Sequence, residues 1–147
     1  MTRLKHVTDI KKPLQEVYSL AKQVDRYPEF LPEYLESRVL ERHHGRLLLE
    51  RKAMVRGTLY AWRSWVSFDD LTGINFEHAA GPLKGMKIRW HFEALSPEDT
   101  RLTITHDIRV DPSVRLAWLK EKFFYAPSVR RMADRVIIGF KQACERN

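Results

Sequence analysis

A few polar side chains interrupt stretches of the chain that are otherwise apolar or aromatic: Arg63, Ser67 and His106. Histidine changes its charge near neutral pH, so His106 is suited to general acid–base work. An arginine can hold an anionic oxygen, which gives Arg63 a candidate role beside it. Arg63, Ser67 and His106 are therefore the candidate catalytic residues.

Two of these candidates also have a purely structural interpretation. A histidine that alternates with Leu102 and Ile104 is commonly a hydrogen-bonded residue of the core or its rim. Arg63 can pair with a nearby carboxylate and do nothing else. The sequence leaves both interpretations open.

The middle of the chain has the two-residue period of β-strands, with turn signals at hairpin spacing. A first strand is predicted at residues 4–10. Further strands are predicted at 36–43, 47–56, 58–68, 74–79, 86–95 and 101–110. The short intervals between about seven strands favour an antiparallel sheet over βαβ units.

Helices are predicted at both ends of this run of strands. One begins at Pro13, and a very short one with an aromatic corner follows Asp25. A shorter helix is predicted at 114–124, and a long one at 127–144 carries a continuous apolar stripe. One long helix with one apolar face needs a sheet to cover it. The predicted fold is therefore α+β: a curved antiparallel sheet around the C-terminal helix, in a single domain over residues 1–147.

This order of elements, together with several motifs, resembles the helix-grip fold of the START and birch-pollen-allergen (SRPBCC) superfamily. The resemblance rests on residues 17–18, 25–34, 81–86 and 101–107 and on the Trp-Arg-Ser-Trp-Val-Ser run at 62–67. These motifs are closest to the polyketide cyclase/dehydrase branch, which includes aromatase/cyclases and is related to coenzyme-Q-binding proteins. The resemblance implies a START-like ligand-binding domain with an internal cavity.

The expected cavity has aromatic and aliphatic walls with sparse polar groups. Similarity to the aromatase/cyclases favours Trp65 and Ser67 as cavity-facing, and alternation favours the inner faces of two later strands. The predicted ligand-binding residues are Tyr27, Tyr34, Trp65, Met86, Ile88, Trp90, Phe92, Ile104 and Phe140. Apolar walls supply burial and a few polar groups fix orientation, which suits a large, partly aromatic, oxygen-bearing molecule.

The resemblance implies that the protein binds a polyketide-like or lipidic molecule, with polyketide cyclisation or dehydration as the enzymatic form of this function. In the related cyclases, an arginine implicated in catalysis lies two residues beyond the serine of the 62–67 motif. Here that position is Asp69, and a carboxylate cannot act as a fixed cation for an enolate. Asp69 therefore favours the alternative, a non-enzymatic carrier or chaperone for a lipid or quinone.

The chain is basic, with 26 Lys and Arg residues against 19 acidic ones and a formal net charge of +7. The cations are spread along the sequence without a block of like charges, so nucleic acid is not expected as a partner. A basic surface would suit peripheral contact with an anionic membrane. The sequence leaves open whether the outer aromatic strand face forms a homodimer.

We expect no cofactor and no metal site. The chain has no phosphate-binding glycine loop and no dinucleotide fingerprint. His43 and His44 are adjacent, so on a strand they would point to opposite faces. Cys144 is the single cysteine, and no run of apolar residues approaches membrane-spanning length. A cytoplasmic location is therefore expected.

Overall fold

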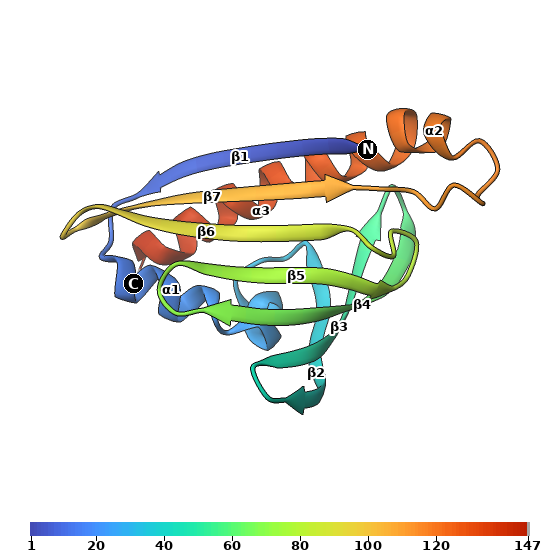
Figure 1. The fold of residues 1–147 in the computed structure, drawn as a ribbon. Helices are drawn as coiled ribbons and strands as arrows, with labels where there is room; N and C mark the ends of the chain where they lie inside the picture. Colours follow the sequence, from blue (N-terminus) through green and yellow to red (C-terminus); the bar gives the residue numbers. More distant parts are fainter. Residues whose placement is uncertain (147) are drawn as a thin grey trace.

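The structure is a computed structural model that describes residues 1–146. Seven strands form one antiparallel sheet in the order β1-β7-β6-β5-β4-β3-β2. Their bounds are β1 (Thr2–Ile10), β2 (Tyr34–His43), β3 (Arg46–Val55), β4 (Thr58–Asp69), β5 (Gly73–Ala80), β6 (Lys87–Ser96) and β7 (Asp99–Ile108). The sheet curves strongly between its edges, β1 and β2 (Figure 1).

The helices occupy the two connections predicted for them. Between β1 and β2 lie α1 (Leu14–Ala21) and the 3₁₀ helix η1 (Val24–Glu29). After β7 the chain forms a continuous helical run of α2 (Ala117–Lys120), the π-helical segment η2 (Glu121–Tyr125) and α3 (Ala126–Arg146). The α+β helix-grip arrangement predicted from the sequence is confirmed.

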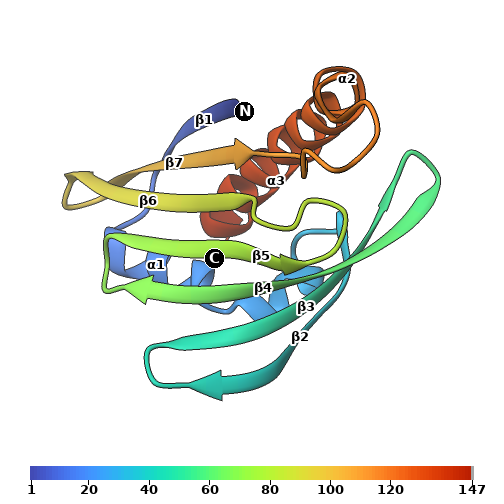
Figure 2. The same ribbon diagram turned by 45° about the vertical axis from the view of Figure 1, so that its right-hand side comes forward.

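Helix α3 lies across the concave side of the sheet, as both ribbon views show (Figures 1 and 2). Its buried side chains form the predicted stripe: Ala126, Ala133, Val136, Ile137, Phe140, Ala143 and Cys144. Phe140 is fully buried and its ring meets the Trp90 ring of β6 edge-on, with 5.2 Å between centroids. Within residues 1–146, no helix is both long enough and apolar enough to cross a membrane.

The hairpin between β3 and β4 ends in a two-residue turn at Arg56 and Gly57. Both residues have positive φ, 50° and 79°, as a tight turn that matches the twist of the flanking strands requires. The Arg56 guanidinium lies 5.1 Å from the centre of the Phe124 ring in η2. The tip of this hairpin therefore contacts the start of the C-terminal helical run.

The helix predicted at 114–124 begins later than expected. Leu116 has φ 58° and ψ 39°, a left-handed conformation, so the helical run starts at Ala117. Neither α2 nor η2 buries a side chain. The left-handed backbone of Leu116 therefore sets the start of the helical run, because a right-handed helix cannot continue through it.

The contact between α3 and the sheet predicts the effect of truncating Phe140. Phe140→Ala should lower the free energy of unfolding by about 3–5 kcal/mol, because it leaves a cavity under Trp90. Urea denaturation followed by circular dichroism measures this change. Ile138→Ala, on the exposed side of the same helix, should stay within about 0.5 kcal/mol of wild type, and equal losses for both variants would contradict the packing described.

Candidate functional site

A cavity of about 130 Å³ lies between the sheet and the first half of α3. Its volume is close to the roughly 150 Å³ that admits benzene in an engineered core. Pockets for drug-sized ligands begin near roughly 300 Å³, so a ligand of that size requires this one to widen. The lining residues are Tyr34, Arg51, Val55, Tyr60, Trp62, Ser64, Phe76, His78, Pro82, Leu83, Met86, Ile88, Trp90, Ile104, His106, Phe124, Tyr125, Ser128, Val129, Met132, Ala133 and Val136.

One end of the cavity is a mouth and the other is deeply buried. Phe76, Trp90 and Ile104 of the deep end are almost completely buried. Partly or fully exposed lining residues come from the β3–β4 hairpin, the β5–β6 loop and η2, which include Val55, Pro82, Phe124 and Tyr125. A ligand would therefore enter between the hairpin tip, this loop and η2.

Strand register decides which side chains of β4 face the cavity. β3 buries Leu49 and Arg51, and residues directly opposite each other on antiparallel strands share a face. Leu49 lies opposite Ser64, and Arg51 lies opposite Trp62. The cavity face of β4 is therefore the one with Trp62 and Ser64.

Arg51 is a buried cation at the deep end, with 5% of the residue exposed. Its Nε donates to Ser37 Oγ and its Nη2 donates to the Val24 carbonyl, both at 3.1 Å. The Tyr27 and Tyr34 ring centres lie 4.5 Å from the guanidinium carbon, in cation–π contact. No ion pair within residues 1–146 involves Arg51. Neutral oxygens and aromatic faces therefore surround the Arg51 guanidinium. An anionic oxygen of a ligand could pair with its charge.

His78 on β5 and His106 on β7 present neutral imidazoles to the cavity. Each residue is 8% exposed, and each Nδ1 is buried without a hydrogen-bond partner in the described part of the chain. Burial, then repulsion from His106 and Arg51, lowers the pKa of His78 to about 3. Burial, then repulsion from His6, lowers the pKa of His106 to about 4. At pH 7 each neutral ring can donate one hydrogen bond and accept one.

Ser128 contributes a third polar atom of this kind from α3. Its Oγ is buried, lines the cavity and has no hydrogen-bond partner among residues 1–146. Buried polar groups in proteins are nearly always hydrogen-bonded. The Nδ1 atoms of His78 and His106 and the Oγ of Ser128 are therefore suitable partners for polar atoms of a ligand.

His6 lies beside His106 but is not part of the cavity wall. Its Nε2 is 2.8 Å from Asp134 Oδ1 on α3, and its ring centre is 6.4 Å from that of His106 at an interplanar angle of 83°. β1 and β7 pair so that Leu4 is opposite His106, which puts His6 diagonally next to it. Sequence reasoning missed the His6–Asp134 pair because the first strand and the last helix meet only in the fold.

The structure places one predicted catalytic residue, His106, in the cavity wall. It also places there the predicted ligand-binding side chains Tyr34, Met86, Ile88, Trp90 and Ile104. Three further predicted ligand-binding residues lie in the core outside the wall, namely Tyr27, Phe92 and Phe140. The Tyr27 hydroxyl donates to the Ala21 carbonyl at 2.7 Å, so this phenol is already engaged.

Contrary to the prediction, the structure places Arg63, Trp65 and Ser67 outside the cavity, on the convex face of β4. Arg63 Nε donates to Glu50 Oε2 at 3.1 Å, which is the structural interpretation left open by the sequence. The Trp65 ring is covered by the Arg46 guanidinium, 4.0 Å away. A cation–π contact lets a tryptophan stay on the solvent side, so aromatic residues occur on both faces of β4.

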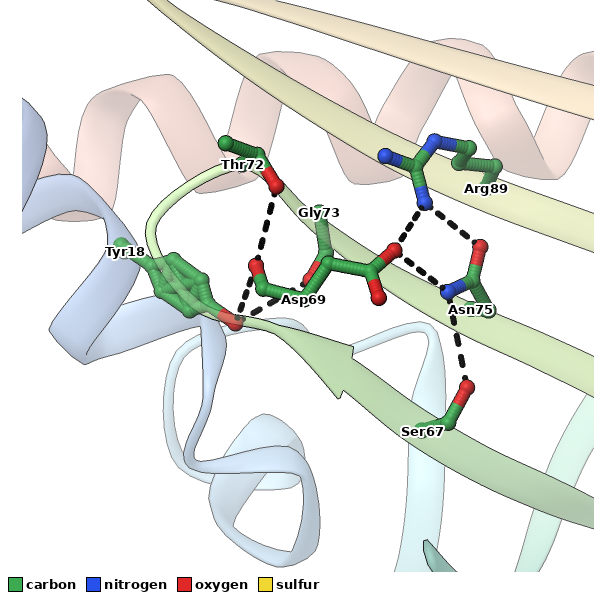
Figure 3. A network of polar contacts seen from close by, with 7 residues as sticks. All are labelled: Tyr18, Ser67, Asp69, Thr72, Gly73, Asn75 and Arg89. Atoms are coloured by element: carbon green, nitrogen blue, oxygen red, sulfur yellow. Dashed lines mark hydrogen bonds and ion pairs between the residues drawn. The ribbon is translucent and has the colours of Figure 1, made fainter. Parts of the chain in front are cut away.

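Asp69 and Ser67 belong to an external polar network (Figure 3). Asp69 Oδ2 accepts hydrogen bonds from Arg89 Nη1 at 2.7 Å and from Asn75 Nδ2 at 3.1 Å. Asn75 Nδ2 also lies 3.4 Å from Ser67 Oγ, and the Tyr18 hydroxyl donates to the Asp69 carbonyl at 3.1 Å. Because Asp69 lies outside the cavity, its difference from the arginine of related cyclases does not bear on the chemistry inside.

Sequence reasoning also missed Arg51 and His78, although the two-residue period marks both. Arg51 alternates with the buried Leu49 and Ala53 of β3, and His78 follows the buried Phe76 on β5 at the same spacing. A polar residue at an apolar position of an alternating strand is the signal that identifies each one.

Comparison with known proteins places the chain in a family. A family model described as "Polyketide cyclase / dehydrase and lipid transport" matches residues 10–137. No curated protein matches the chain in sequence.

Several solved structures share the fold at low sequence identity. The ZhuI aromatase/cyclase from Streptomyces sp. R1128 is 19% identical with a TM-score of 0.90, over 99% of this chain and 94% of that one. A protein from Thermus thermophilus is 19% identical with a TM-score of 0.84, over 97% of each chain. A START superfamily protein from Mycobacterium smegmatis is 16% identical with a TM-score of 0.80, over 98% of this chain and 97% of that one.

The buried imidazoles predict a pH-dependent stability. Between pH 7 and pH 5 the unfolded chain, with histidine pKa values near 6.5, binds protons that the neutral rings of the folded state do not. Wild type should therefore lose about 2 kcal/mol of unfolding free energy for each of His78 and His106. Urea denaturation at both pH values should show this loss, and His78→Gln/His106→Gln should remove most of it. His91→Gln, at an exposed position, is the control, and an unchanged slope in the double variant would contradict the burial described.

Proposed function

The chain belongs to the polyketide cyclase/dehydrase and lipid transport family, and from this premise we propose that it binds an oxygen-bearing polyketide-like or lipidic molecule in the cavity beside α3. The observation that carries the proposal is the set of polar groups in an otherwise apolar cavity. His78 Nδ1, His106 Nδ1 and Ser128 Oγ have no hydrogen-bond partner among residues 1–146, and Arg51 adds a buried charge without an ion pair there. A purely hydrocarbon ligand would leave the three atoms without partners and the charge unpaired, which disfavours it.

The arrangement of the cavity orients such a ligand. Aromatic walls such as Trp62 and Trp90 accept the faces of rings or unsaturated chains. Arg51 at the deep end pairs with a carbonyl, enolate or carboxylate oxygen. His78 and His106 then contact oxygen atoms further along the molecule. The polar contacts fix one register of the chain, as cyclisation to one product requires.

The enzymatic form of the function is aldol cyclisation followed by dehydration. A neutral His106 takes a proton from a carbon between two carbonyl groups, and the enolate carbon attacks a carbonyl further along the same chain. The new alkoxide recovers the proton from the imidazolium. His106 then takes the remaining proton from the same carbon, the new enolate expels hydroxide with formation of a double bond, and the imidazolium gives its proton to the hydroxide, which leaves as water. Arg51 stabilises the enolate oxygen, which compensates for the low basicity of His106.

A non-enzymatic carrier is the second candidate function. Arg51 is the sole Lys or Arg among the described residues of the cavity wall. A carrier needs the same apolar walls and polar anchors but no base. The cavity also opens beside exposed aromatic residues of η2 and α2, as suits a protein that collects ligands from an apolar phase.

A matched pair of probes tests whether the cavity recognises oxygen. 1-Naphthol and 1-methylnaphthalene have nearly the same shape, and wild type should bind the naphthol about three- to ten-fold more tightly, the size of one net hydrogen bond. Arg51→Met and His106→Leu should each reduce this ratio in fluorescence titrations, while Arg63→Met on the convex face should keep it. Arg51 also joins β3 to η1, so Arg51→Met can fail to fold. In that case His106→Leu alone tests whether polar groups of the cavity cause the preference for naphthol. The absence of a preference in wild type, or its loss in Arg63→Met, would rule out these anchors.

Turnover separates the enzyme from the carrier. A synthetic poly-β-ketone thioester cyclises slowly in buffer to a mixture that liquid chromatography with mass spectrometry resolves. An enzyme should enrich one cyclised, dehydrated product, and His106→Gln should lower its rate about 10²-fold or more while 1-naphthol still binds. Arg63→Gln is the matched control with full turnover. A wild-type protein that binds the thioester but leaves the product mixture unchanged would be a carrier.

A further inference from the structure

The segment that precedes α3 exposes three large apolar side chains. Leu116 is 52% exposed, Trp118 is 69% exposed and Phe123 is 62% exposed. They lie within eight consecutive residues, from the N-cap of α2 into η2, and neither of these elements buries a side chain. Water-facing apolar groups at this density indicate a surface that contacts something else. We call Leu116, Trp118 and Phe123 the apolar ridge.

The apolar ridge lies beside the cavity mouth. Phe124 and Tyr125, directly after it, line the cavity. Across the mouth, Arg56 at the tip of the β3–β4 hairpin contacts the Phe124 ring at 5.1 Å. In both ribbon views α2 stands out from the end of the sheet at which this hairpin tip lies (Figures 1 and 2). The ridge is therefore a projection next to an entrance.

Positive charge gathers around the same segment. Residues 109–131 hold six Lys and Arg residues and two acidic ones, and all six cations are exposed: Arg109, Arg115, Lys120, Lys122, Arg130 and Arg131. Glu121 Oε2 is engaged by the N-terminal amino group at 3.4 Å and by the Thr2 hydroxyl at 2.7 Å. None of the six cations forms an ion pair within the described chain. More than half of the excess charge of +7 thus lies in this stretch.

We propose that the apolar ridge docks the cavity mouth onto an anionic lipid bilayer. Trp118 and Phe123 enter the interfacial region, where amphipathic aromatic rings are favoured. Lys120, Lys122 and their neighbours contact the acidic headgroups. A projecting ridge suits a bilayer better than a folded acidic protein, which would need a matching groove to bury Trp118.

Docking would place the mouth against lipid, so an apolar ligand could enter or leave the cavity without crossing water. The hairpin and η2, which meet through Arg56 and Phe124, are the elements that would separate to widen the mouth. Docking does not depend on which molecule the cavity holds, and it goes beyond the proposed ligand binding.

Vesicle sedimentation tests the docking. Wild type is mixed with vesicles of phosphatidylglycerol and phosphatidylcholine in equal parts, or of phosphatidylcholine alone. Binding to the anionic vesicles should be about ten-fold or more tighter and should weaken in high salt. Trp118→Ala/Phe123→Ala should lose about ten-fold in affinity through the lost apolar insertion. Ile138→Ala, an exposed apolar position on α3, should bind as wild type does.

The same variants distinguish the possible failures. The ridge variant should still bind 1-naphthol, so lost vesicle binding with intact naphthol binding supports docking by itself. Absence of wild-type binding to anionic vesicles would overturn the proposal. Vesicle binding by the ridge variant as tight as that of wild type would also overturn it, because net charge alone would then explain the binding. Binding of the ridge to an acidic carrier protein without any binding to vesicles would replace the bilayer with a protein partner.

Discussion

Arg51 is buried and forms no ion pair within residues 1–146, and the segments around it are arranged so that its charge is tolerated. The Val24 carbonyl at the start of η1 and the Ser37 hydroxyl of β2 accept its hydrogen bonds. Tyr27 and Tyr34 cover it with ring faces at 4.5 Å. The guanidinium therefore joins the short helices to the deep end of the sheet. It also leaves the cavity with a positive end, which sets the chemistry that the rest of the cavity can support.

Burial also determines the state of the two histidines in the cavity wall. His78 and His106 lie far enough from water that their protonated forms are disfavoured, so the imidazoles remain neutral hydrogen-bonding groups at pH 7. One permanent cation and two neutral rings in an apolar wall can orient a carbonyl chain. The cavity volume of about 130 Å³ is below that of pockets for larger ligands, so binding of a whole carbonyl chain would require the mouth between η2 and the hairpin to open. The polar groups at the deep end and the exposed apolar ridge therefore lie at opposite ends of the same cavity.

The fold could be predicted from the sequence because burial on one face leaves a regular period, and every strand and α3 lies within a few residues of its prediction. The site could be predicted only in part. Trp65 faces solvent because Arg46 covers its ring, a contact between neighbouring strands that the alternation of β4 does not reveal. Arg51 occupies an apolar position of β3, but its burial depends on Tyr27 and Tyr34, which tertiary structure brings to it. The prediction placed the wrong face of β4 toward the cavity, because the packing partners that decide this lie outside that strand.

Nitrogen-15 NMR of the histidine side chains, with and without 1-naphthol, tests most directly whether the cavity is the binding site. If the cavity binds the probe, the ring signals of His78 and His106 should shift on its addition. His43, His44 and His91 are exposed and serve as internal references whose signals should stay in place. Shifts confined to these three exposed histidines, with the two buried ones unchanged at saturation, would contradict the account.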